Sequence, residues 1–330
     1  MFNNLLIISL IIFSNLLILY FFENISNYVD INDKPNSRKI HKYPIPLLGG
    51  GIFIISFLVL YLINLDFFFK NFSFNPHIFF CFCVLFFLFG LFDDKFNLNP
   101  LFKTFLQILL LFIFLEVSEN QIIDKIRISF TENIFLIDGK HYSIFFTLLC
   151  IFLYQNAINM FDGINLQLGL YVATCVIIIN FFLKDTLFLI FLIPLFIFLY
   201  LNFKNKCFFG NSGAYFIAFF LGIIFIDCYN NDKILFSDYI FIFMSLPGID
   251  MARLFIIRIA NKKNPFKADK KHIHHILLEK VSYNKAILYS YLNFLIPVFI
   301  LLLTKNSIIS FLVFLIFYIF NTTNINKKIF

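Results

Sequence analysis

Two adjacent carboxylates, Asp93 and Asp94, directly follow a run of Phe, Leu, Val and Cys in the segment FGLFDDKFNLNP, residues 89–100. An unpaired carboxylate in such surroundings costs about 3 kcal/mol at a bilayer centre and less near the interface. A cation or a set of hydrogen-bond donors is therefore expected to compensate these charges. Carboxylates suit Mg²⁺, which also binds phosphate oxygens and water. In the simpler alternative, Asp93 and Asp94 only end a membrane span in water.

Four further polar segments carry groups that suit an anionic substrate. They are DKPNSRKIHKYPIPLLGGG (33–51), NAINMFDGIN (156–165), FFGNSGAY (208–215) and NPFKADKKHIHH (264–275). Asp162 adds a third carboxylate, and Lys103 follows the acid pair in the chain. Gly210 and Gly213 flank Asn211 at the expected start of an apolar helix, where free N–H groups and the positive dipole end can hold a phosphate. Basic residues surround the histidines: Arg253, Arg258, Lys262, Lys263, Lys267, Lys270 and Lys271.

Carboxylates, a cation and a phosphate cradle at a membrane surface indicate phosphoryl transfer, in which positioning and charge neutralisation do most of the catalysis. Each feature also has a structural explanation. The glycines at 49–51 are typical of close helix packing, and the basic run 262–271 is typical of a cytoplasmic anchor. Solvation in a loop or bonding between helices would explain the other polar side chains: His272, His274, His275, Asn156 and Asn159.

The composition defines the class of protein. Of 330 residues, 61% are hydrophobic and 14% charged, and the mean hydropathy is +0.88. This apolar share far exceeds that of a soluble domain. We predict an all-α polytopic integral membrane protein with about eleven transmembrane helices in a single domain, residues 1–330, the first helix being retained and not cleaved. The predicted spans are 5–22, 48–65, 77–92, 101–117, 143–160, 166–183, 186–202, 213–228, 236–257, 286–303 and 306–321.

The distribution of Lys and Arg predicts which helix ends face the cytosol. With the N-terminus outside, the inner loops and tail hold 19 basic residues and the outer loops hold 7. The acid pair and the four polar segments then lie on the cytoplasmic face, as does the C-terminus. The net charge of +7 is in this interpretation a topology signal and gives no reason to expect nucleic acid. The outer segment 124–142 alternates enough to suggest a small hairpin.

The order of the motifs points to a family. From Asp93 onward the series DDKFNLNPLFK, NAINMFDGIN, GNSGA and HIHH resembles the polyprenyl-phosphate N-acetylhexosamine 1-phosphate transferases, of glycosyltransferase family 4 type. The segment RKIHKYPIPLLGGG is similar to the first cytoplasmic loop of that family, so the resemblance covers nearly the whole chain. The segment NPFKADKKHIHHILLEK is closer to the undecaprenyl-phosphate N-acetylglucosaminyl 1-phosphate transferases. The phospho-N-acetylmuramoyl-pentapeptide branch typically has three consecutive histidines there.

The resemblance implies an enzyme of the bacterial inner (plasma) membrane. It would transfer an N-acetylhexosamine 1-phosphate from a UDP-sugar to undecaprenyl (polyprenyl) phosphate and release UMP, the initiating step of cell-envelope polysaccharide synthesis such as that of lipopolysaccharide O-antigen. The implied cofactor is Mg²⁺ or Mn²⁺. The implied partners are the prenyl phosphate, the UDP-N-acetylhexosamine and the bilayer, with no nucleic acid. The oligomeric state stays open, a homodimer being one alternative.

The resemblance also implies roles for individual residues. Asp93 would be the base that keeps the lipid phosphate ionised, Asp94 would help to hold the metal, and Asp162 would orient the attack or bind metal through water. Direct displacement and a covalent phospho-aspartate route are both compatible with these carboxylates. Substrate contacts would come from Lys103, Asn156, Asn159, His272, His274 and His275, and metal ligands would be Asp94, Asn159 and Asn211.

Two departures from the family pattern leave alternatives open. Asn211 stands where the family has the Asp of GDxG, and Asn165 stands where many members have the second Asp of DGxDG. An amide oxygen can ligate Mg²⁺ but carries no full charge. The alternatives to an active transferase are a catalytically impaired relative that binds lipid phosphate or nucleotide sugar, and a transporter, for which polar groups are expected near the bilayer midplane.

Overall fold

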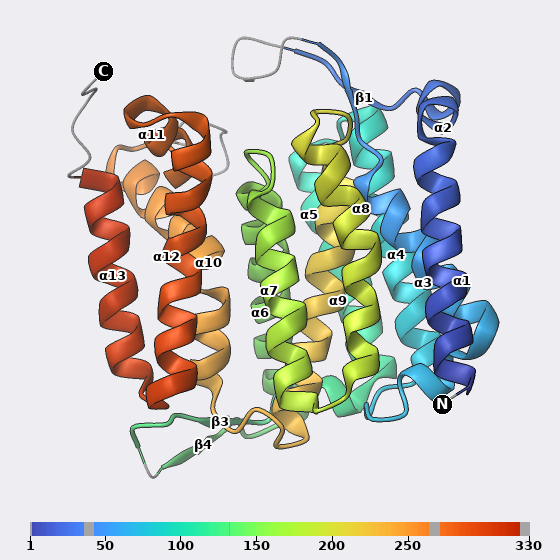
Figure 1. Ribbon diagram of the computed structural model, residues 1–330. Coiled ribbons are helices and arrows are strands. Elements are labelled where there is room, and N and C mark those ends of the chain that lie inside the picture. The colour runs from blue at the N-terminus through green and yellow to red at the C-terminus, as the bar shows by residue number, and fades with distance from the viewer. Residues whose placement is uncertain (1, 36–42, 132, 264–270, 324–330) are drawn as a thin grey trace.

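The computed structural model describes residues 2–35, 43–131, 133–263 and 271–323. It is a bundle of helices that run roughly parallel between two ends (Figure 1). The helices are α1 (Phe2–Tyr20), α2 (Phe22–Val29), α3 (Gly49–Phe68), α4 (Pro76–Phe96), α5 (Pro100–Val117), α6 (Lys140–Phe161), α7 (Gln167–Leu183), α8 (Leu192–Phe203), α9 (Gly210–Asn230), α10 (Ser237–Ala260), α11 (Ile273–Lys280), α12 (Tyr283–Thr304) and α13 (Ser307–Thr323), with 3-10 helices η1 (Glu119–Gln121) and η2 (Thr186–Phe191).

The helices confirm the all-α polytopic membrane fold. Within the described residues, eight helices are long and apolar enough to cross a membrane, and there are nine if α1 and α2, bent by 65° at a short break, count as one span. The remaining two apolar helices, α7 and α13, have 17 residues each, at the lower limit for a span. Each of the eleven predicted apolar segments is therefore helical.

The two ends of the bundle differ. One end carries the strands β3 (Lys125–Arg127) and β4 (Ile134–Leu136), which pair antiparallel and confirm the predicted hairpin. The opposite end carries α2, α11 and the short strands β1 (Asn32–Asp33) and β2 (Ile45–Pro46) (Figure 1). We call these the hairpin face and the site face. Helix α1 begins at the hairpin face and α13 ends at the site face.

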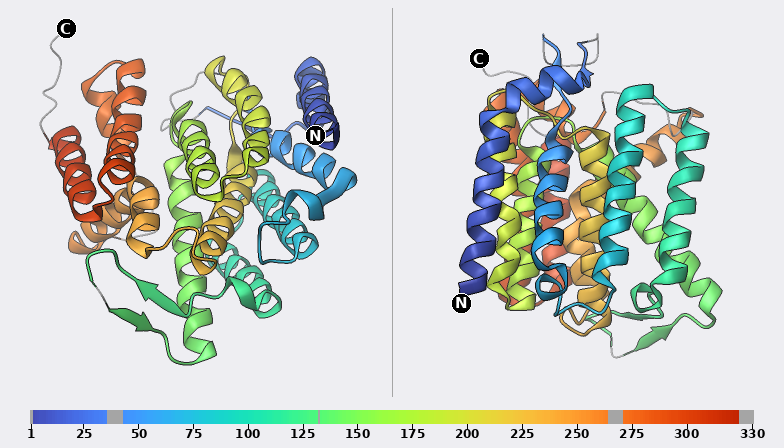
Figure 2. Two further views of the ribbon diagram at one scale, coloured as in Figure 1. Left: turned by 60° about the horizontal axis from the view of Figure 1, so that its bottom comes forward. Right: turned by 90° about the vertical axis from the view of Figure 1, so that its right-hand side faces the viewer.

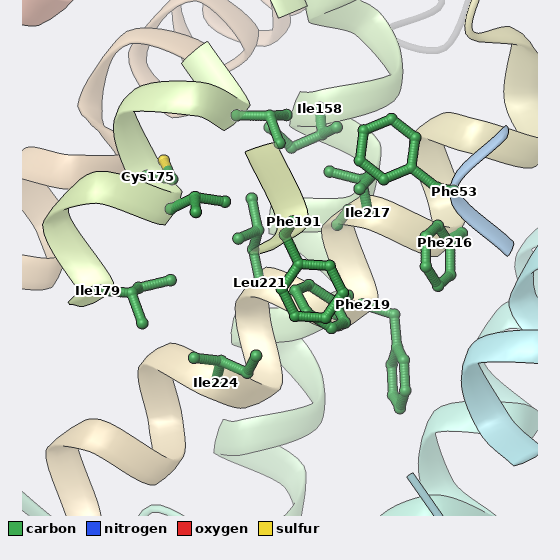
Figure 3. Packing of buried hydrophobic residues seen from close by; sticks show 14 of the residues in the cluster. Phe53, Ile158, Cys175, Ile179, Phe191, Phe216, Ile217, Phe219, Leu221 and Ile224 are labelled. Carbon is green, nitrogen blue, oxygen red and sulfur yellow. The ribbon is translucent and has the colours of Figure 1, made fainter. Parts of the chain in front are cut away.

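Helix α9 is the centre of the bundle and is buried along its length. It packs against α3, α4, α6 and α7, and Figure 3 shows its apolar side chains meeting rings from neighbouring helices. The Phe219 ring lies 4.6 Å from that of Phe86 on α4 and 5.0 Å from that of Phe114 on α5. Helices α10, α12 and α13 form a separate group beside α6 (Figures 1 and 2). The abundant phenylalanine therefore serves core packing here.

Glycines bring α3 and α4 into backbone contact with the first turn of α9. A Cβ added at Gly50 would lie 2.5 Å from the Gly213 nitrogen, and one added at Gly90 would lie 2.4 Å from the Asn211 carbonyl oxygen. Both neighbours are backbone atoms, which cannot move aside cheaply. The interpretation of the glycines at 49–51 as close packing is confirmed for Gly50, whereas Gly51 has no atom within 4 Å of an added Cβ.

The adjacent glycines Gly50 and Gly51 give a matched test of this contact. We expect Gly50→Ala to lower the thermal unfolding midpoint in detergent by several degrees, because α3 must move away from α9. Gly51→Ala should leave the midpoint unchanged or raise it slightly, since Ala favours a helix over Gly by up to about 1 kcal/mol. Equal midpoints for the two variants would show that the close approach of α3 to α9 contributes nothing to stability.

Candidate active site

Lys103 is the cation that compensates Asp93. Asp93 lies in the last turn of α4 and is only 4% exposed. Its Oδ2 accepts a hydrogen bond from Lys103 Nζ on α5, and its Oδ1 accepts one from the Leu98 N–H at 3.2 Å. Lys103 also lies over the ring of Tyr215 on α9, 5.2 Å from its centroid. The two helices that follow each other in the chain thus hold an ion pair at the site face.

Asp94 caps helix α9 from α4. Its Oδ1 accepts a hydrogen bond from the Asn211 N–H at 2.9 Å, and its Oδ2 accepts one from the Ser212 N–H at 3.0 Å. Gly210 has a φ of 72°, and a Cβ there would lie 2.7 Å from Asp94 Oδ2. Two of the N–H groups expected to be free at this helix start, those of Asn211 and Ser212, therefore already have a carboxylate of the protein as acceptor.

Two amides continue the site from α9 to α6. Asn159 Nδ2 donates to Asn211 Oδ1 at 3.0 Å, so the side chain at the position of the Asp in GDxG receives a hydrogen bond from α6. Asn156 donates to Phe152 O at 2.8 Å and to Gln107 Oε1 at 3.3 Å. The bond to Gln107 joins α6 to α5, as the structural explanation of Asn156 predicts. Its role as a substrate contact stays a prediction.

Asp162 ends α6 and brings a third carboxylate to the site face. Among the described residues, no hydrogen bond or ion pair engages its side chain. Burial, followed by the negative charges of Asp94 and Asp33, raises the pKa of Asp162 from 3.8 to about 7. Because its surroundings disfavour the ionised form of Asp162, a divalent cation bound there would stabilise that form.

Asn165 has a structural role that sequence analysis missed. Its Nδ2 donates to Asn202 O and to Asn205 Oδ1, both at 2.7 Å, in the turn before α7. Asn202 Oδ1 in turn accepts from the Leu166 N–H at 2.6 Å. An Asp at position 165 could not donate either bond, so the amide suits this turn. Asn165 is therefore occupied in joining the α6–α7 turn to the end of α8.

The histidines of HIHH contact one another, and one of them, His274, lies against the residue that follows Asp162. His272 and His274 have parallel rings, with 2° between the planes and 5.4 Å between centroids, and the His274 ring lies 4.4 Å from that of His275. His274 packs against Gly163, where an added Cβ would lie 2.1 Å from its ring. Burial, followed by the two neighbouring histidines, lowers the pKa of His274 to about 3. His274 is therefore a neutral side chain at physiological pH.

Asp250 is a site residue that sequence analysis missed. It lies inside α10, is 2% exposed, and accepts a hydrogen bond from His272 Nδ1 at 2.8 Å and an ion-pair hydrogen bond from Arg253 at 2.9 Å. An acidic residue within the apolar run 236–257 was the available signal. Arg253, which we expected to bind substrate anions, thus has a carboxylate partner. Two of the other basic residues expected around the histidines, Lys267 and Lys270, lie outside the described residues.

The donor set suits a hard divalent cation. Asp162 offers a carboxylate without a protein partner among the described residues, next to the Asp94 carboxylate and the amide pair Asn159–Asn211. Mg²⁺ is commonly held by one or two carboxylates, with phosphates and water as the other ligands. In the described part of the chain, no group of three or more His, Cys, Asp or Glu is arranged as a metal site. Phosphate oxygens of a substrate would therefore have to complete the coordination.

An apolar cavity of about 790 Å³ lies between α6, α9, α10 and α13. It is lined near the hairpin face by Ile126 and Phe130 and farther up the bundle by Ala157, Gly248 and Ala252. Ala157 precedes Asp162 by five residues, which is about 7.5 Å along a helix. The upper end of this cavity is therefore close to the carboxylates of the site face.

Asp94→Asn should lower the thermal midpoint, whereas Asp162→Asn should not lower it at pH 8. In Asp94→Asn the amide side chain would keep one acceptor for two N–H groups, and a buried unpaired donor costs about 1–3 kcal/mol, so the midpoint should fall. The raised pKa of Asp162 means that stability declines as the pH rises from about 4 through 7. At pH 8 with a chelator, Asp162→Asn should therefore match or exceed the wild type. The reverse order of midpoints would contradict these assignments.

Known proteins resemble this chain along most of its length. Residues 76–229 match the sequence pattern of glycosyl transferase family 4. An undecaprenyl-phosphate alpha-N-acetylglucosaminyl 1-phosphate transferase from Thermotoga maritima is 27% identical over 78% of this chain and 76% of its own length. A probable undecaprenyl-phosphate N-acetylglucosaminyl 1-phosphate transferase from Bacillus subtilis is 28% identical over 86% of this chain and 80% of its own length. An undecaprenyl-phosphate alpha-N-acetylglucosaminyl 1-phosphate transferase from Escherichia coli K12 is 26% identical over 82% of this chain and 75% of its own length. The match includes Asp93, Asp94, Asp162 and Asn211, so this chain is similar to glycosyl transferase family 4 across the candidate site.

Proposed function

We propose that this protein transfers an N-acetylhexosamine 1-phosphate from a UDP-sugar to undecaprenyl phosphate and releases UMP. The names of three similar proteins support undecaprenyl phosphate as the acceptor and N-acetylglucosamine as the first sugar to test. N-acetylgalactosamine, N-acetylfucosamine and N-acetylquinovosamine would use the same chemistry. The product would be the first lipid-linked intermediate of a cell-envelope polysaccharide, with O-antigen as one candidate.

The observation that carries this proposal is the Lys103–Asp93 ion pair at the membrane end of α4 and α5. It lies at the site face with the Asp94 cap and with Asp162, whose carboxylate has no partner among the described residues. These groups stand at helix ends, where the headgroup of a membrane lipid and a water-soluble nucleotide can meet. A transporter is expected to place such groups at mid-span on broken helices, so the position of the carboxylates favours the transferase.

The cavity between α6 and α10 supports a lipid acceptor. Its lining is almost entirely apolar, and its upper end lies close to Asp162. A prenyl chain in this cavity would place its phosphate at the level of the site-face carboxylates. The same cavity offers little to a polar nucleotide sugar, which would enter from the site face.

In the proposed reaction, an oxygen of the lipid phosphate attacks the sugar-side phosphorus of the UDP-sugar, and the bond from that phosphorus to the UMP oxygen breaks. Asp93 accepts the remaining proton of the lipid phosphate, which makes the nucleophile a dianion. Protonation of Asp93 weakens its attraction for Lys103, whose ammonium group then neutralises the phosphate. A phospho-aspartate route through Asp93 stays an alternative.

Asp162 and Asp94, with the amide oxygens of Asn159 and Asn211, would hold a divalent Mg²⁺ or Mn²⁺ ion. When bound, such an ion would neutralise charge on the diphosphate as the UMP leaving group departs. Asp162 needs no rearrangement of protein contacts within the described residues to serve as a ligand, whereas Asp94 must keep the cap of α9 while doing so. We therefore assign Asp162 as the principal carboxylate ligand.

The site face is proposed to be cytoplasmic, with the N-terminus periplasmic or extracellular in a bacterial plasma membrane. The excess of Lys and Arg on the loops of the site face supports this orientation, because basic loops stay on the cytoplasmic side. A UDP-sugar made in the cytosol would then reach the carboxylates directly. The hairpin of β3 and β4 would lie on the outer side.

UMP release by the purified protein in detergent tests the proposal. With undecaprenyl phosphate, a panel of UDP-N-acetylhexosamines and Mg²⁺ or Mn²⁺, we expect release with at least one sugar and none with a chelator. Asp93→Asn should lower release by at least about 1,000-fold, because the lipid phosphate loses its base and Lys103 loses its partner. Release without any lipid would indicate the phospho-aspartate route.

Binding measurements separate a failed assay from a wrong assignment. The wild type and Asp93→Asn should both unfold cooperatively and bind the UDP-sugar. Folded wild-type protein that binds the UDP-sugar and the lipid without releasing UMP would contradict the transferase and favour a binding protein. In that case Asn211→Asp, which restores the family's carboxylate, is the next variant to assay.

Filling the cavity tests the position of the lipid. Gly248 lines the cavity, and no atom lies within 4 Å of a Cβ added there. We expect Gly248→Leu to raise the KM for undecaprenyl phosphate several-fold, to leave the KM for the UDP-sugar unchanged, and to affect a short-chain prenyl phosphate less. Gly51→Leu is the control, since Gly51 is equally open but lies on α3 outside the cavity lining. Equal effects of both variants would place the prenyl chain elsewhere.

A further inference from the structure

We propose that Asp250 is a positioning residue, which holds His272 and, through it, His274 beside Asp162, so that α10 and α13 take part in binding the UDP-sugar. This inference rests on the proposed function of the site. Asp250 itself is not expected to touch substrate. Its effect would pass through the two histidine rings.

Asp250 is the centre of a buried hydrogen-bond cluster. Its Oδ2 accepts from His272 Nδ1 at 2.8 Å. Its Oδ1 accepts from Tyr318 Oη of α13 at 2.8 Å, from Arg253 at 2.9 Å and from the Ile273 N–H at 3.1 Å. Three segments, α10, α13 and the start of α11, therefore meet at a single carboxylate. Such a cluster fixes its members more firmly than any one bond would.

Arg253 adds a second connection from this cluster to the histidine segment. Its Nε donates to Tyr318 Oη at 2.7 Å, and its Nη2 donates to Lys271 O at 2.5 Å as well as to Asp250. The residue before His272 and the residue after it are thus both held by the Asp250 cluster. Because Arg253 supplies the opposite charge, the buried carboxylate is compensated.

The contact with Asp250 decides which nitrogen of His272 is available. An ionised carboxylate only accepts hydrogen bonds, so Nδ1 of His272 carries a proton. Nε2 is then the only ring nitrogen left for a substrate group. An Asn at position 250 would present either an oxygen or an N–H₂ group to Nδ1 and would no longer fix this choice.

The His272 ring is connected to the neighbourhood of Asp162 through the His274 ring. The His274 ring lies parallel to that of His272 and against Gly163, which leaves no room for a Cβ. His274 is 2% exposed, and its Nδ1 has no hydrogen-bond partner among the described residues. A shift of His272 would therefore change the packing of His274 on the residue that follows Asp162.

Steady-state kinetics of Asp250→Asn test the inference. We expect kcat/KM for the UDP-sugar to fall about 10–100-fold, the range found when the hydrogen-bond partner of a metal-ligating histidine is removed, mainly through a higher KM. The KM for undecaprenyl phosphate should stay within about twofold of the wild type. Asp250→Glu, which keeps the charge, should recover part of the loss.

A double-mutant cycle with His272→Ala shows whether Asp250 acts through that ring. We expect the double variant Asp250→Asn/His272→Ala to be no worse than His272→Ala alone, because the ring that Asp250 positions is already absent. Multiplied losses in the double variant, or an unchanged KM for the UDP-sugar in Asp250→Asn, would overturn the inference. If Asp250→Asn does not fold, the same cycle with Asp250→Glu decides in the same way.

Asp227→Asn is the matched control. Asp227 is also a fully buried carboxylate within a membrane helix, but it lies near the hairpin face, where it accepts from the Ser73 N–H at 2.8 Å and from Gln121 Nε2 at 3.0 Å. We expect it to lower the thermal midpoint without changing either KM. A rise in the KM for the UDP-sugar equal to that of Asp250→Asn would mean that general destabilisation explains both. Absence of UMP release by the wild type would instead contradict the proposed function.

Discussion

The Asp94 carboxylate accepts hydrogen bonds from the N–H groups of Asn211 and Ser212 in the first turn of α9, and the arrangement of the site depends on this contact. The first N–H groups of a helix have no partner within it, and a negative charge at the positive end of the helix dipole is stabilising. The cap requires α4 to approach α9 closely, which Gly90 allows on one helix and Gly210, with its φ of 72°, allows on the other. The same approach places Asn211 opposite Asn159 and Tyr215 beneath Lys103.

Three carboxylates of the site face, those of Asp93, Asp94 and Asp162, are compensated in different ways. Asp93 has the ammonium group of Lys103, and Asp94 has the N-terminus of α9. Asp162 has neither, and burial with the charges of Asp94 and Asp33 raises its pKa to about 7. A divalent cation would remove this unfavourable charge. In the proposed reaction this difference would divide the roles: Asp93 would accept a proton, Asp94 would keep the cap of α9, and Asp162 would be the principal metal ligand.

Much of the fold could be predicted because a membrane simplifies the physics. Apolar segments of about 17 residues or more have to be helical, so all eleven were recognisable, as was the hairpin at 124–142. The site motifs could be named because Asp93, Asp162 and the histidines are of chemically active types. Their partners could not. Asp94 capping α9 and Asp250 binding His272 join helices far apart in sequence, and no local pattern encodes such contacts.

The presence of Asn at positions 165 and 211 follows from the same contacts. Asn165 donates two hydrogen bonds that a carboxylate could not donate. Asn211 receives one from Asn159 and begins a helix that Asp94 already caps. A carboxylate at 211 would bring further negative charge close to Asp94, a cost that only a bound cation would offset. With an amide there, the metal-free site carries less repulsion, while Mg²⁺ can still draw its negative ligands from Asp162 and the diphosphate. The amide at 211 is therefore compatible with the proposed reaction, in which it would weaken metal binding before the substrate arrives.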